Sequence, residues 1–438
     1  FVPVSADALQ IQIDGVIQAN NFTISGSTVT FDFTPNSGSV CNSIKHFGVG
    51  LLTTVSDGAI TEAKIGSGAV TSSKIASGVI PTSRPNAQAL IINGNMAVAQ
   101  RSTSVTSITS GGFKTVDRFK LNLNSLGTWT QTQNTLSASD TPFTHGFTKS
   151  LKMDVTTADS SPSASDDCQI YYLPEGQDLQ LLKKGTANAE KITIGFWIKA
   201  TKTGTNILAI YDRDNNRLNS QSYTVSSSDT WEYKVVNFPA DTTGAIDNDN
   251  NKSFEIRWVL GVGSTYTSGS LQTTWATYSD ANYAVGQVNN ADSTSNNWEI
   301  TGVQLEVGEF TSATIPPFQH ESFGDNLARC QRYFQMRAEG NQKIISIAHW
   351  GSGSEVDFIM QIPFMRTRPS VEYTTGNEYW AIGGGGSTNT LDNLNMNSWS
   401  TEMNINLWTT TGAGGTTGFA YYGYSNNSSA KLGFTAEL

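Results

Sequence analysis

Apolar and polar residues alternate with a period of two over much of the chain. The clearest examples are residues 11–15, 29–33, 192–199, 231–235 and 303–307. This is the period of a strand with one buried face. Polar runs rich in Asp and Asn separate the alternating segments, as at 212–216 and 247–251. The pattern predicts an all-β protein of short antiparallel strands, with two-sheet packing over residues 88–320.

The faces of these predicted strands are read from the same alternation. In residues 192–199 it places Ile192, Ile194, Phe196 and Ile198 on one face. In residues 231–235 it places Trp231, Tyr233 and Val235 together. Trp258 lies in a continuously apolar segment, so we expect it in the core.

A ten-residue repeat interrupts the alternation between residues 57 and 81. Gly, a small or β-branched apolar residue, Thr and Lys-Ile recur in each copy, and the aliphatic residues are spaced by five. Such a segment is too thin to bury these side chains by itself. We therefore expect identical chains to bury them around a common axis, as the stalk of a symmetric fibre. The stalk residues are Ile60, Ile65, Val70, Ile75 and Ile80.

Only residues 325–334 have a convincing helical period. Leu327, Cys330 and Phe334 share one face there, and Asp325 is the expected N-cap. A glycine run, Gly383–Gly386, is expected to form a flexible loop. The predicted organisation is a small N-terminal β domain at 1–54, the repeat stalk at 55–87, a β-sandwich at 88–320, a linking helix at 321–334 and a C-terminal β-rich tip domain at 335–438.

Several of these segments resemble phage tail fibres. Residues 91–101, Ile-Ile-Asn-Gly-Asn-Met-Ala-Val-Ala-Gln-Arg, and 115–119, Thr-Val-Asp-Arg-Phe, resemble the opening of a carbohydrate-binding-like jelly roll in those fibres. Residues 300–308 resemble its closing strand, and 327–334 the segment that follows it. The N-terminal strands and the repeats resemble fibre shafts.

The resemblance implies a receptor-binding protein with a jelly roll at 88–320 and a β-sandwich knob at its C-terminal end. It implies a homotrimer on the outside of the virion that attaches a bacteriophage to its host. The implied partners are a host surface glycan and, through the N-terminal side, other virion tail or head proteins.

Composition agrees with an extracellular binding protein. Charged residues make up 15% of the chain, against about a quarter in ordinary globular proteins. Ser, Thr, Asn, Gln and Gly must therefore cover much of the surface. The formal net charge of −10 argues against nucleic acid as a partner. No apolar stretch approaches the roughly 20 residues of a membrane helix, so we expect no membrane insertion.

The three cysteines, Cys41, Cys168 and Cys330, are far apart and include no CxxC pair. We read no disulfide framework from them and expect three buried thiols. The chain opens on strand-like sequence at Phe1 without a signal peptide. We therefore expect natural residues to precede it.

No catalytic constellation stands out, and the protein is predicted not to be an enzyme. The densest acidic pairs, Asp212 with Asp214 and Asp247 with Asp249, lie in polar loops, where Asp usually caps turns. A long parallel β-helix of ~20–25-residue repeats, the scaffold expected of a polysaccharide-cleaving spike, is also absent from the sequence.

The same acidic pairs do not form EF-hands. Arg217 and Lys252 stand where such a loop needs Gly, and Tyr223 and Trp258 where it needs Glu. The four histidines have no zinc-site spacing. No metal is assigned and no cofactor is required. Because related carbohydrate-binding modules often hold calcium, a structural calcium bound by non-consecutive loop oxygens remains an alternative.

Aromatic side chains in polar segments are the best candidates for glycan contact. Sugar rings stack their C–H faces on Trp and Tyr, while their hydroxyls bond to Asn, Asp and Gln. The candidates in the sandwich are Trp275, Tyr278 and Tyr283, and those in the tip domain are Tyr379, Trp380 and Tyr422. The favoured hypothesis is non-enzymatic glycan attachment by a homotrimeric fibre. A glycan-degrading tailspike and a purely structural virion fibre or connector are the alternatives.

Overall fold

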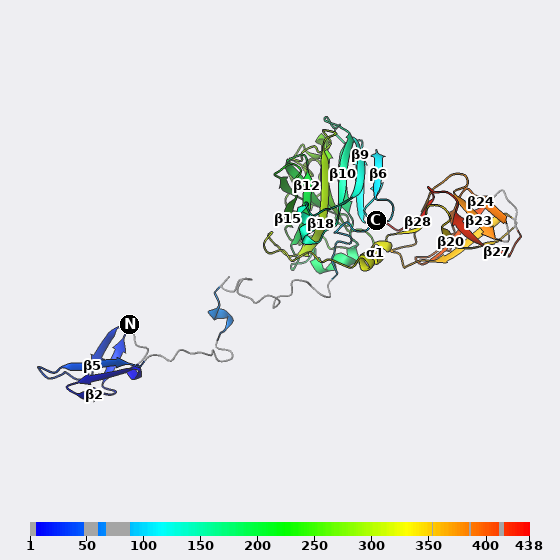
Figure 1. Cartoon of the computed structure of the whole chain (residues 1–438). Helices are drawn as coiled ribbons and strands as arrows, with labels where there is room; N and C mark the ends of the chain where they lie inside the picture. The colour runs from blue at the N-terminus through cyan, green and yellow to red at the C-terminus, as the bar shows by residue number, and fades with distance from the viewer. Residues whose placement is uncertain (1–5, 48–59, 67–87, 353, 385–386, 411–415) are drawn as a thin grey trace. The chain divides into compact units, whose positions relative to one another are not determined.

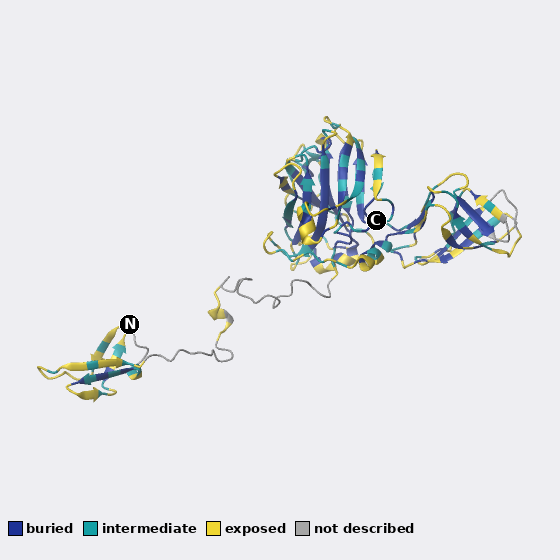
Figure 2. Cartoon of the chain, in the orientation of Figure 1, coloured by how far each residue is buried: buried dark blue, intermediate teal, exposed yellow. Residues whose placement is uncertain are grey.

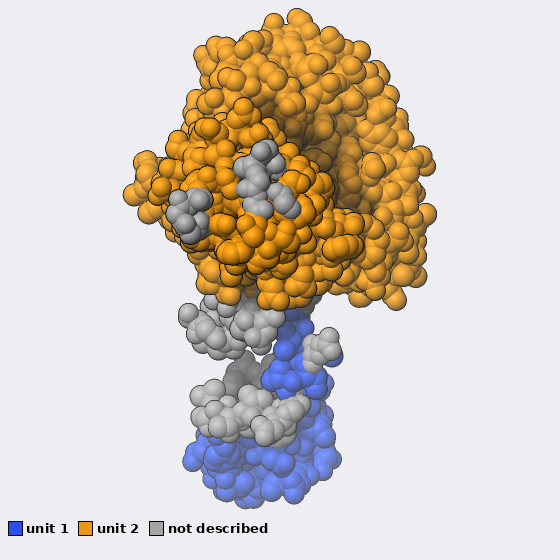
Figure 3. All heavy atoms as spheres, turned by 90° about the vertical axis from the view of Figure 1, so that its right-hand side faces the viewer, with its two compact units in different colours: residues 1–81 blue, residues 82–438 orange. Residues whose placement is uncertain are grey.

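The structure is a computed structural model that describes residues 6–47, 60–66, 88–352, 354–384, 387–410 and 416–438. The chain divides into two compact units, Phe1–Pro81 and Thr82–Leu438 (Figure 3). Neighbouring strands in the sheets pair antiparallel. The all-β class predicted from the alternation is therefore confirmed (Figure 1).

The N-terminal unit is built on a small three-stranded sheet and a hairpin. Alternate residues of β1 (Leu9–Ile13) are buried and pack with Phe22, as the period of two predicts. Cys41, at the start of β5, is exposed, so the expectation of three buried thiols is wrong at this position. The other strands are β2 (Val16–Gln18), β3 (Phe22–Ser25), β4 (Thr28–Phe31) and β5 (Cys41–His46).

Two of the predicted stalk residues fall within the described part of the chain. Ile60 is 58% exposed and Ile65 is 44% exposed, on either side of a 3-10 turn, η2 (Glu62–Lys64). Val70, Ile75 and Ile80 lie outside the described residues. Both isoleucines are thus exposed among the described residues, and their burial between chains stays a prediction.

The second unit begins with a sandwich of two sheets. The six-stranded sheet has the order β15-β12-β18-β10-β9-β6, and the seven-stranded sheet has the order β17-β14-β13-β16-β11-β8-β7. The first comprises β6 (Ser104–Ile108), β9 (Thr128–Thr135), β10 (Lys149–Thr157), β12 (Ile192–Ala200), β15 (Glu232–Phe238) and β18 (Asn297–Val307). The second comprises β7 (Gly112–Phe113), β8 (Phe119–Asn124), β11 (Asp167–Tyr172), β13 (Gly204–Asp212), β14 (Arg217–Val225), β16 (Phe254–Val262) and β17 (Ala276–Thr277).

One large apolar core lies between these sheets, and Figure 2 shows that much of their strands is buried. The predicted face of β12, Ile192 to Ile198 in alternation, points into this core, and Trp258 is fully buried there. The predicted buried face of residues 231–235, which combined Trp231, Tyr233 and Val235, is not the core face of this strand. Val236 and Phe238 supply the core face of β15, whereas Trp231 packs with Trp197 in a separate apolar cluster.

The predicted linking helix exists with different ends. α1 spans Phe323–Gln331, and its N-cap is Ser322, whose hydroxyl accepts from the Asp325 backbone N–H at 3.2 Å. Asp325 is thus in the first turn rather than at the cap, and Phe334 begins strand β19 instead of extending the helix. No helix in the described part of the chain is long and apolar enough to cross a membrane.

The C-terminal domain is a second pair of sheets with its own core. Gly383 and Gly384 end strand β23, so the predicted glycine loop begins within a strand; Gly385 and Gly386 lie outside the described residues. The smaller sheet comprises β19 (Phe334–Glu339), β28 (Lys431–Thr435) and β22 (Ser370–Tyr373). The larger comprises β24 (Ser387–Leu391), β23 (Trp380–Gly384), β27 (Ala420–Ser425), β20 (Ile344–Trp350), β21 (Glu355–Gln361), β26 (Asn404–Thr410) and β25 (Asn395–Met396).

A buried arginine joins this domain to the sandwich. Arg118 is fully buried, donates to Glu437 Oε2 at 2.8 Å and to the Leu173 carbonyl at 2.6 Å, and lies against the ring of Tyr333. Arg101 adds a second ion pair to Glu437 at 3.3 Å. Breaking such a buried pair costs several kcal/mol, so the last residues of the described chain are firmly bound to the sandwich.

Asp117, beside this junction, makes stability depend on pH. Burial raises the pKa of its carboxyl from about 3.8 to about 6, although Gln100 donates two hydrogen bonds to it. Because the folded pKa exceeds the unfolded value, the group stabilises the fold below about pH 4 and loses that contribution as pH rises through 6.

We therefore expect Asp117→Asn to remove this pH dependence. Between pH 7 and pH 4, the free energy of unfolding of the wild type should rise relative to the variant by up to about 3 kcal/mol. Urea titrations at several pH values measure the difference. Asp154→Asn, on a partly exposed strand position, is the control. Parallel curves for the wild type and Asp117→Asn would contradict the expectation.

Candidate ligand-binding surface

The aromatic residues singled out in the sequence lie in three places. Trp275 is at one edge of the seven-stranded sheet, beside β14 and β17. Tyr278 and Tyr283 pack over the outer face of the same sheet. Tyr379, Trp380 and Tyr422 belong to the C-terminal domain.

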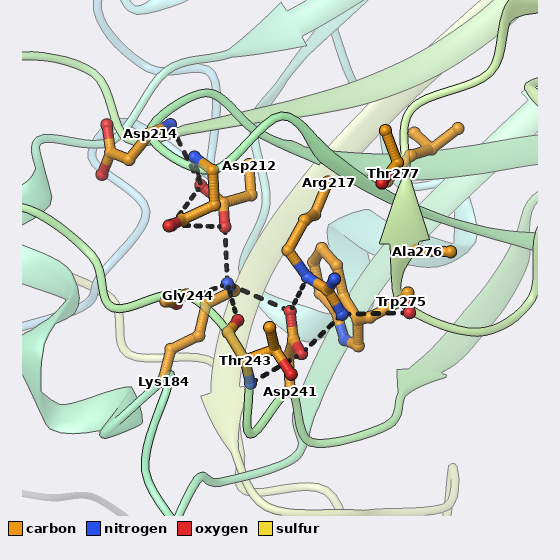
Figure 4. A network of polar contacts seen from close by, with 12 residues as sticks. Lys184, Asp212, Asp214, Arg217, Asp241, Thr243, Gly244, Trp275, Ala276 and Thr277 are labelled. Atoms are coloured by element: carbon orange, nitrogen blue, oxygen red, sulfur yellow. Dashed lines mark hydrogen bonds and ion pairs between the residues drawn. The ribbon is translucent and has the colours of Figure 1, made fainter.

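Trp275 is held in place by packing and hydrogen bonds (Figure 4). Its ring stacks on Phe254, with centroids 6.0 Å apart, and its indole N–H donates to the Pro239 carbonyl at 2.7 Å. Its own carbonyl accepts from Arg217 at 3.0 Å. The side chain is half-buried, so only part of the ring is available to a ligand.

A buried network of ion pairs lies next to Trp275 (Figure 4). The Lys184 ammonium contacts the carboxylates of Asp212 at 2.5 Å and Asp241 at 3.0 Å. It also donates to the carbonyls of Thr243 and Gly244 at 3.0 and 2.8 Å. Arg217 bonds to both oxygens of Asp241, at 2.8 and 2.9 Å. Each buried carboxylate is therefore neutralised by a side chain of the same chain.

One member of each acidic pair, Asp212 and Asp249, caps a turn, as the sequence suggested. Asp212 Oδ1 accepts from the backbone N–H groups of Asp214 and Asn215, and Asp214 accepts from the N–H of Asp247. Asp249 accepts from the N–H of Asn251 at 2.9 Å. Among the described residues, no group of three or more His, Cys, Asp or Glu side chains could hold a metal ion. The structural calcium stays a prediction from the resemblance.

Four tyrosines surround one arginine on the outer face of the seven-stranded sheet. The Arg257 guanidinium lies 4.8 to 5.9 Å from the ring centroids of Tyr171, Tyr211, Tyr278 and Tyr283. These five residues are the Arg257 cluster. Tyr171 is the direct cross-strand partner of Arg257, so the cluster is set by the register of β11 on β16. The period of two turns Tyr171, Tyr211 and Arg257 outward, because their strand neighbours fill the core.

The cluster contains two of the aromatic residues proposed from the sequence, Tyr278 and Tyr283. It supports Tyr278 as a contact residue and corrects the assignment of Tyr283. Tyr278 is half-buried, contacts the Tyr211 ring at 4.9 Å and donates its hydroxyl to Asp280 at 2.7 Å. Tyr283 is fully buried and donates to Gln169, so it supports the cluster and cannot present a ring to a ligand. Tyr171, Tyr211 and Arg257 were missed, although each occupies an outward position beside core residues, which alternation could have indicated.

Three cations share one carboxylate beside the cluster. Glu255, the partner of Arg257, also contacts Lys252 at 2.8 Å and Arg213 at 3.7 Å. Burial opposes ionisation of Glu255, but Arg257 and Lys252 outweigh this and lower its pKa. Lys120, the cross-strand partner of Tyr171, is the fourth cation, and its pKa is lowered by burial and by the nearby Lys252.

Two further carboxylates lie at the cluster: Asp167 on β11, whose pKa is raised by burial, and Asp280, which accepts from the Tyr278 hydroxyl. Amide side chains lie beside Asp167: Asn122 donates to it, and Gln169 is at the next outward position. The outer face thus combines partly exposed aromatic rings, amides and, at Glu255, three cations on one carboxylate, within a chain of net charge −10.

The candidates in the C-terminal domain are not brought into one site. Trp380 is fully buried and donates to the Thr374 carbonyl at 3.1 Å, so its assignment as a contact residue is wrong in this structure. Tyr379 is half-buried against the domain core. Tyr422 is 52% exposed on β27, where its direct cross-strand partner is Ile347.

Comparison with known proteins gives no family assignment. No family model matches the sequence, and no curated protein matches it. Among similar solved structures, the enzymatically active domain of tailspike protein 4 from bacteriophage CBA120 is 12% identical, with a TM-score of 0.26 over 50% of this chain and 21% of that one. A putative sugar-binding protein from Bacteroides thetaiotaomicron is 11% identical, with a TM-score of 0.27 over 50% of this chain and 100% of that one.

A family 11 carbohydrate-binding module from Clostridium thermocellum is 12% identical, with a TM-score of 0.23 over 48% of this chain and 98% of that one. The similar structures thus include a phage tailspike domain and carbohydrate-binding proteins. This chain spans about a fifth of the tailspike structure's length. These TM-scores are too low to indicate a shared function.

We expect Lys184→Met to destabilise the sandwich by about 3 kcal/mol or more, because it leaves the buried Asp212 carboxylate without its cation. Chemical denaturation followed by tryptophan fluorescence measures the loss. Lys191→Met is the matched control: its pair with Glu309 is half exposed, so its removal should cost less than about 1 kcal/mol. Equal effects of the two changes would contradict the structural role of the network.

Proposed function

We propose that this protein is a homotrimeric fibre that attaches a virion to a bacterial surface glycan without cleaving it. The observation that carries the proposal is the Arg257 cluster. Partly exposed rings of Tyr171, Tyr211 and Tyr278 lie beside amides and cations on one sheet face. A sugar can stack its C–H face on such rings while its hydroxyls bond to the polar groups.

The charges of this surface favour an acidic saccharide. Lys252 and Arg213 share one carboxylate with Arg257, and Lys120 lies nearby. A sugar carboxylate or phosphate would complete the pairing of these cations, and charge complementarity contributes mainly to specificity and to the rate of association. The proposed ligand is therefore a surface polysaccharide with acidic residues.

A fibre with three copies of a weak site can bind tightly. Simultaneous engagement of linked sites raises apparent affinity by about 10²–10⁴ without a deep pocket. The repeat supports a threefold stalk, since Ile60 and Ile65 are exposed in the single chain. In this proposal the N-terminal side binds other virion proteins and the second unit faces the host.

Non-enzymatic binding is supported by the ion pairs that hold three buried carboxylates of the sandwich, those of Asp212, Asp241 and Glu255. Glycoside hydrolysis needs two carboxyl groups free to act on either side of the bond. Asp212 and Asp241 are held by Lys184 and Arg217, and Glu255 is held by Arg257 and Lys252. Each of these carboxylates is committed to a structural ion pair.

The charge argument is tested with Arg213→Gln combined with Lys252→Gln. On a glycan array, the wild type should bind saccharides that carry uronate, sialate or phosphate groups, and binding should weaken as salt rises. The double variant should bind them about tenfold less well, since two favourable charge contacts are lost. Lys183→Gln with Lys191→Gln, which removes two exposed cations elsewhere, is the control.

Equal binding by both double variants would contradict the assignment to the Arg257 cluster. Release of oligosaccharides from a bound polysaccharide would instead establish a glycan-degrading spike. Failure of the intact protein to bind any glycan or bacterial surface would favour a purely structural fibre.

The stalk is tested by native mass spectrometry of the full chain. We expect a trimer, and Ile65→Asp combined with Ile75→Asp should dissociate it, because burying each isoleucine contributes roughly 1.5–3 kcal/mol. Lys64→Gln with Lys74→Gln, in the same repeats, serves as the control. A monomer in the unmutated protein would refute the fibre proposal.

A further inference from the structure

A pocket of about 390 Å³ opens on the outer face of the six-stranded sheet, on the side of the sandwich away from the Arg257 cluster. Trp197 of β12 and Tyr233 of β15 line it from the sheet, with His145 and Phe147 beside them. A strap, residues 310–320, passes over the same face and contributes Phe318 and His320. We call it the Trp197 pocket.

Two glycines shape its sheet wall. Gly302 has φ +64°, and a Cβ there would lie 2.8 Å from Phe147 and 3.0 Å from Trp197. A Cβ at Gly195 would lie 2.5 Å from the Tyr233 hydroxyl and 2.7 Å from Ile315. The register of β12 on β18 also shifts between Gly195 and Trp197, a β-bulge that redirects side chains locally. Any other residue at these two positions would displace the aromatic groups.

Aromatic rings form the walls of the pocket. Trp197 lies 5.2 Å from Tyr233 and 5.1 Å from His145 between ring centroids, and Phe147 lies 4.9 Å from His320. The core tryptophans of the sandwich are fully buried, whereas Trp197 is half-buried and lines open space. A partly exposed indole beside a pocket is a stacking platform for a sugar ring.

A buried polar group, Gln304, holds the Tyr233 side chain and the strap in place. Gln304 donates to the Tyr233 hydroxyl at 3.3 Å and to the Pro316 carbonyl at 3.0 Å. Its own carbonyl oxygen is buried and has no hydrogen-bond partner among the described residues. Burial and the Glu306 carboxylate raise the pKa of Tyr233 to about 12, so its hydroxyl stays neutral.

The lining of the pocket carries no fixed positive charge. None of the described residues that line it is Lys or Arg, and the acidic Glu306 lies near Tyr233. The absence of fixed cations from the lining disfavours an anionic ligand here, whereas the cations at the Arg257 cluster favour one. The volume is at the lower end of the roughly 300–1,000 Å³ of small-molecule sites, which suits one or two sugar rings.

We propose that the Trp197 pocket is a second glycan site, which binds an uncharged saccharide by stacking on Trp197. The choice of a saccharide as ligand rests on the proposed glycan-binding function. The two sites together would let one sandwich engage a surface polysaccharide through both acidic and neutral residues, on opposite faces.

The test measures binding of neutral saccharides to the full chain by saturation-transfer NMR. The panel contains monosaccharides and disaccharides: glucosides, galactosides, mannosides and N-acetylglucosaminides. A member of this panel should bind the wild type, and Trp197→Ala should weaken its binding at least tenfold. Trp399→Ala is the matched control, because Trp399 is 80% exposed in the C-terminal domain. Arg213→Gln with Lys252→Gln should leave neutral binding unchanged.

A second variant tests the pocket in case Trp197→Ala disturbs folding. Ser312→Trp adds an indole at an exposed position of the strap that lines the pocket, so it should block the ligand without removing core packing. Near-ultraviolet circular dichroism checks the fold of each variant. Retained binding in both Trp197→Ala and Ser312→Trp would overturn the inference.

The two proposals fail in distinguishable ways. If acidic saccharides bind but no neutral one does, the Trp197 pocket is not a glycan site while the Arg257 cluster keeps its proposed role. If neither class binds, the glycan-binding function fails and this inference fails with it.

Discussion

The structure of the second unit depends on one constraint: each strand of the sandwich must bury one face in a shared core. Trp129, Trp258 and Trp298 are fully buried in that core. Burying an aromatic side chain of this size contributes on the order of 1.5–3 kcal/mol or more. The opposite face of every strand is then fixed by the period of two, so the core decides which side chains are offered to ligands.

That constraint explains why the two outer faces differ. On the seven-stranded sheet, outward positions of β11, β13 and β16 carry Tyr171, Tyr211 and Arg257, which the strand register gathers into one cluster. On the six-stranded sheet, outward positions of β12 carry Gly195 and Trp197, and the glycine leaves room for aromatic groups to approach. One core therefore supports two surfaces of different charge and shape.

Buried charges hold the parts around the core in place. Lys184 and Arg217 neutralise Asp212 and Asp241 at one edge of the sandwich, and Arg118 binds Glu437 where the C-terminal domain meets it. Such pairs add little net stability compared with apolar packing, but losing one partner is costly. We therefore interpret them as contacts that fix the positions of these segments.

The sequence by itself determined the all-β class, the core faces of strands such as β12, the burial of Trp258 and the helix near residue 325, because these follow from local periodicity. It also indicated that Asp212 and Asp249 cap turns. It did not determine which of the candidate aromatics are exposed: Tyr283 and Trp380 are buried, and residues distant in the chain contribute to both burials. The cluster at Arg257 and the pocket at Trp197 depend on strand register and on packing across the sheets, which only the tertiary structure decides.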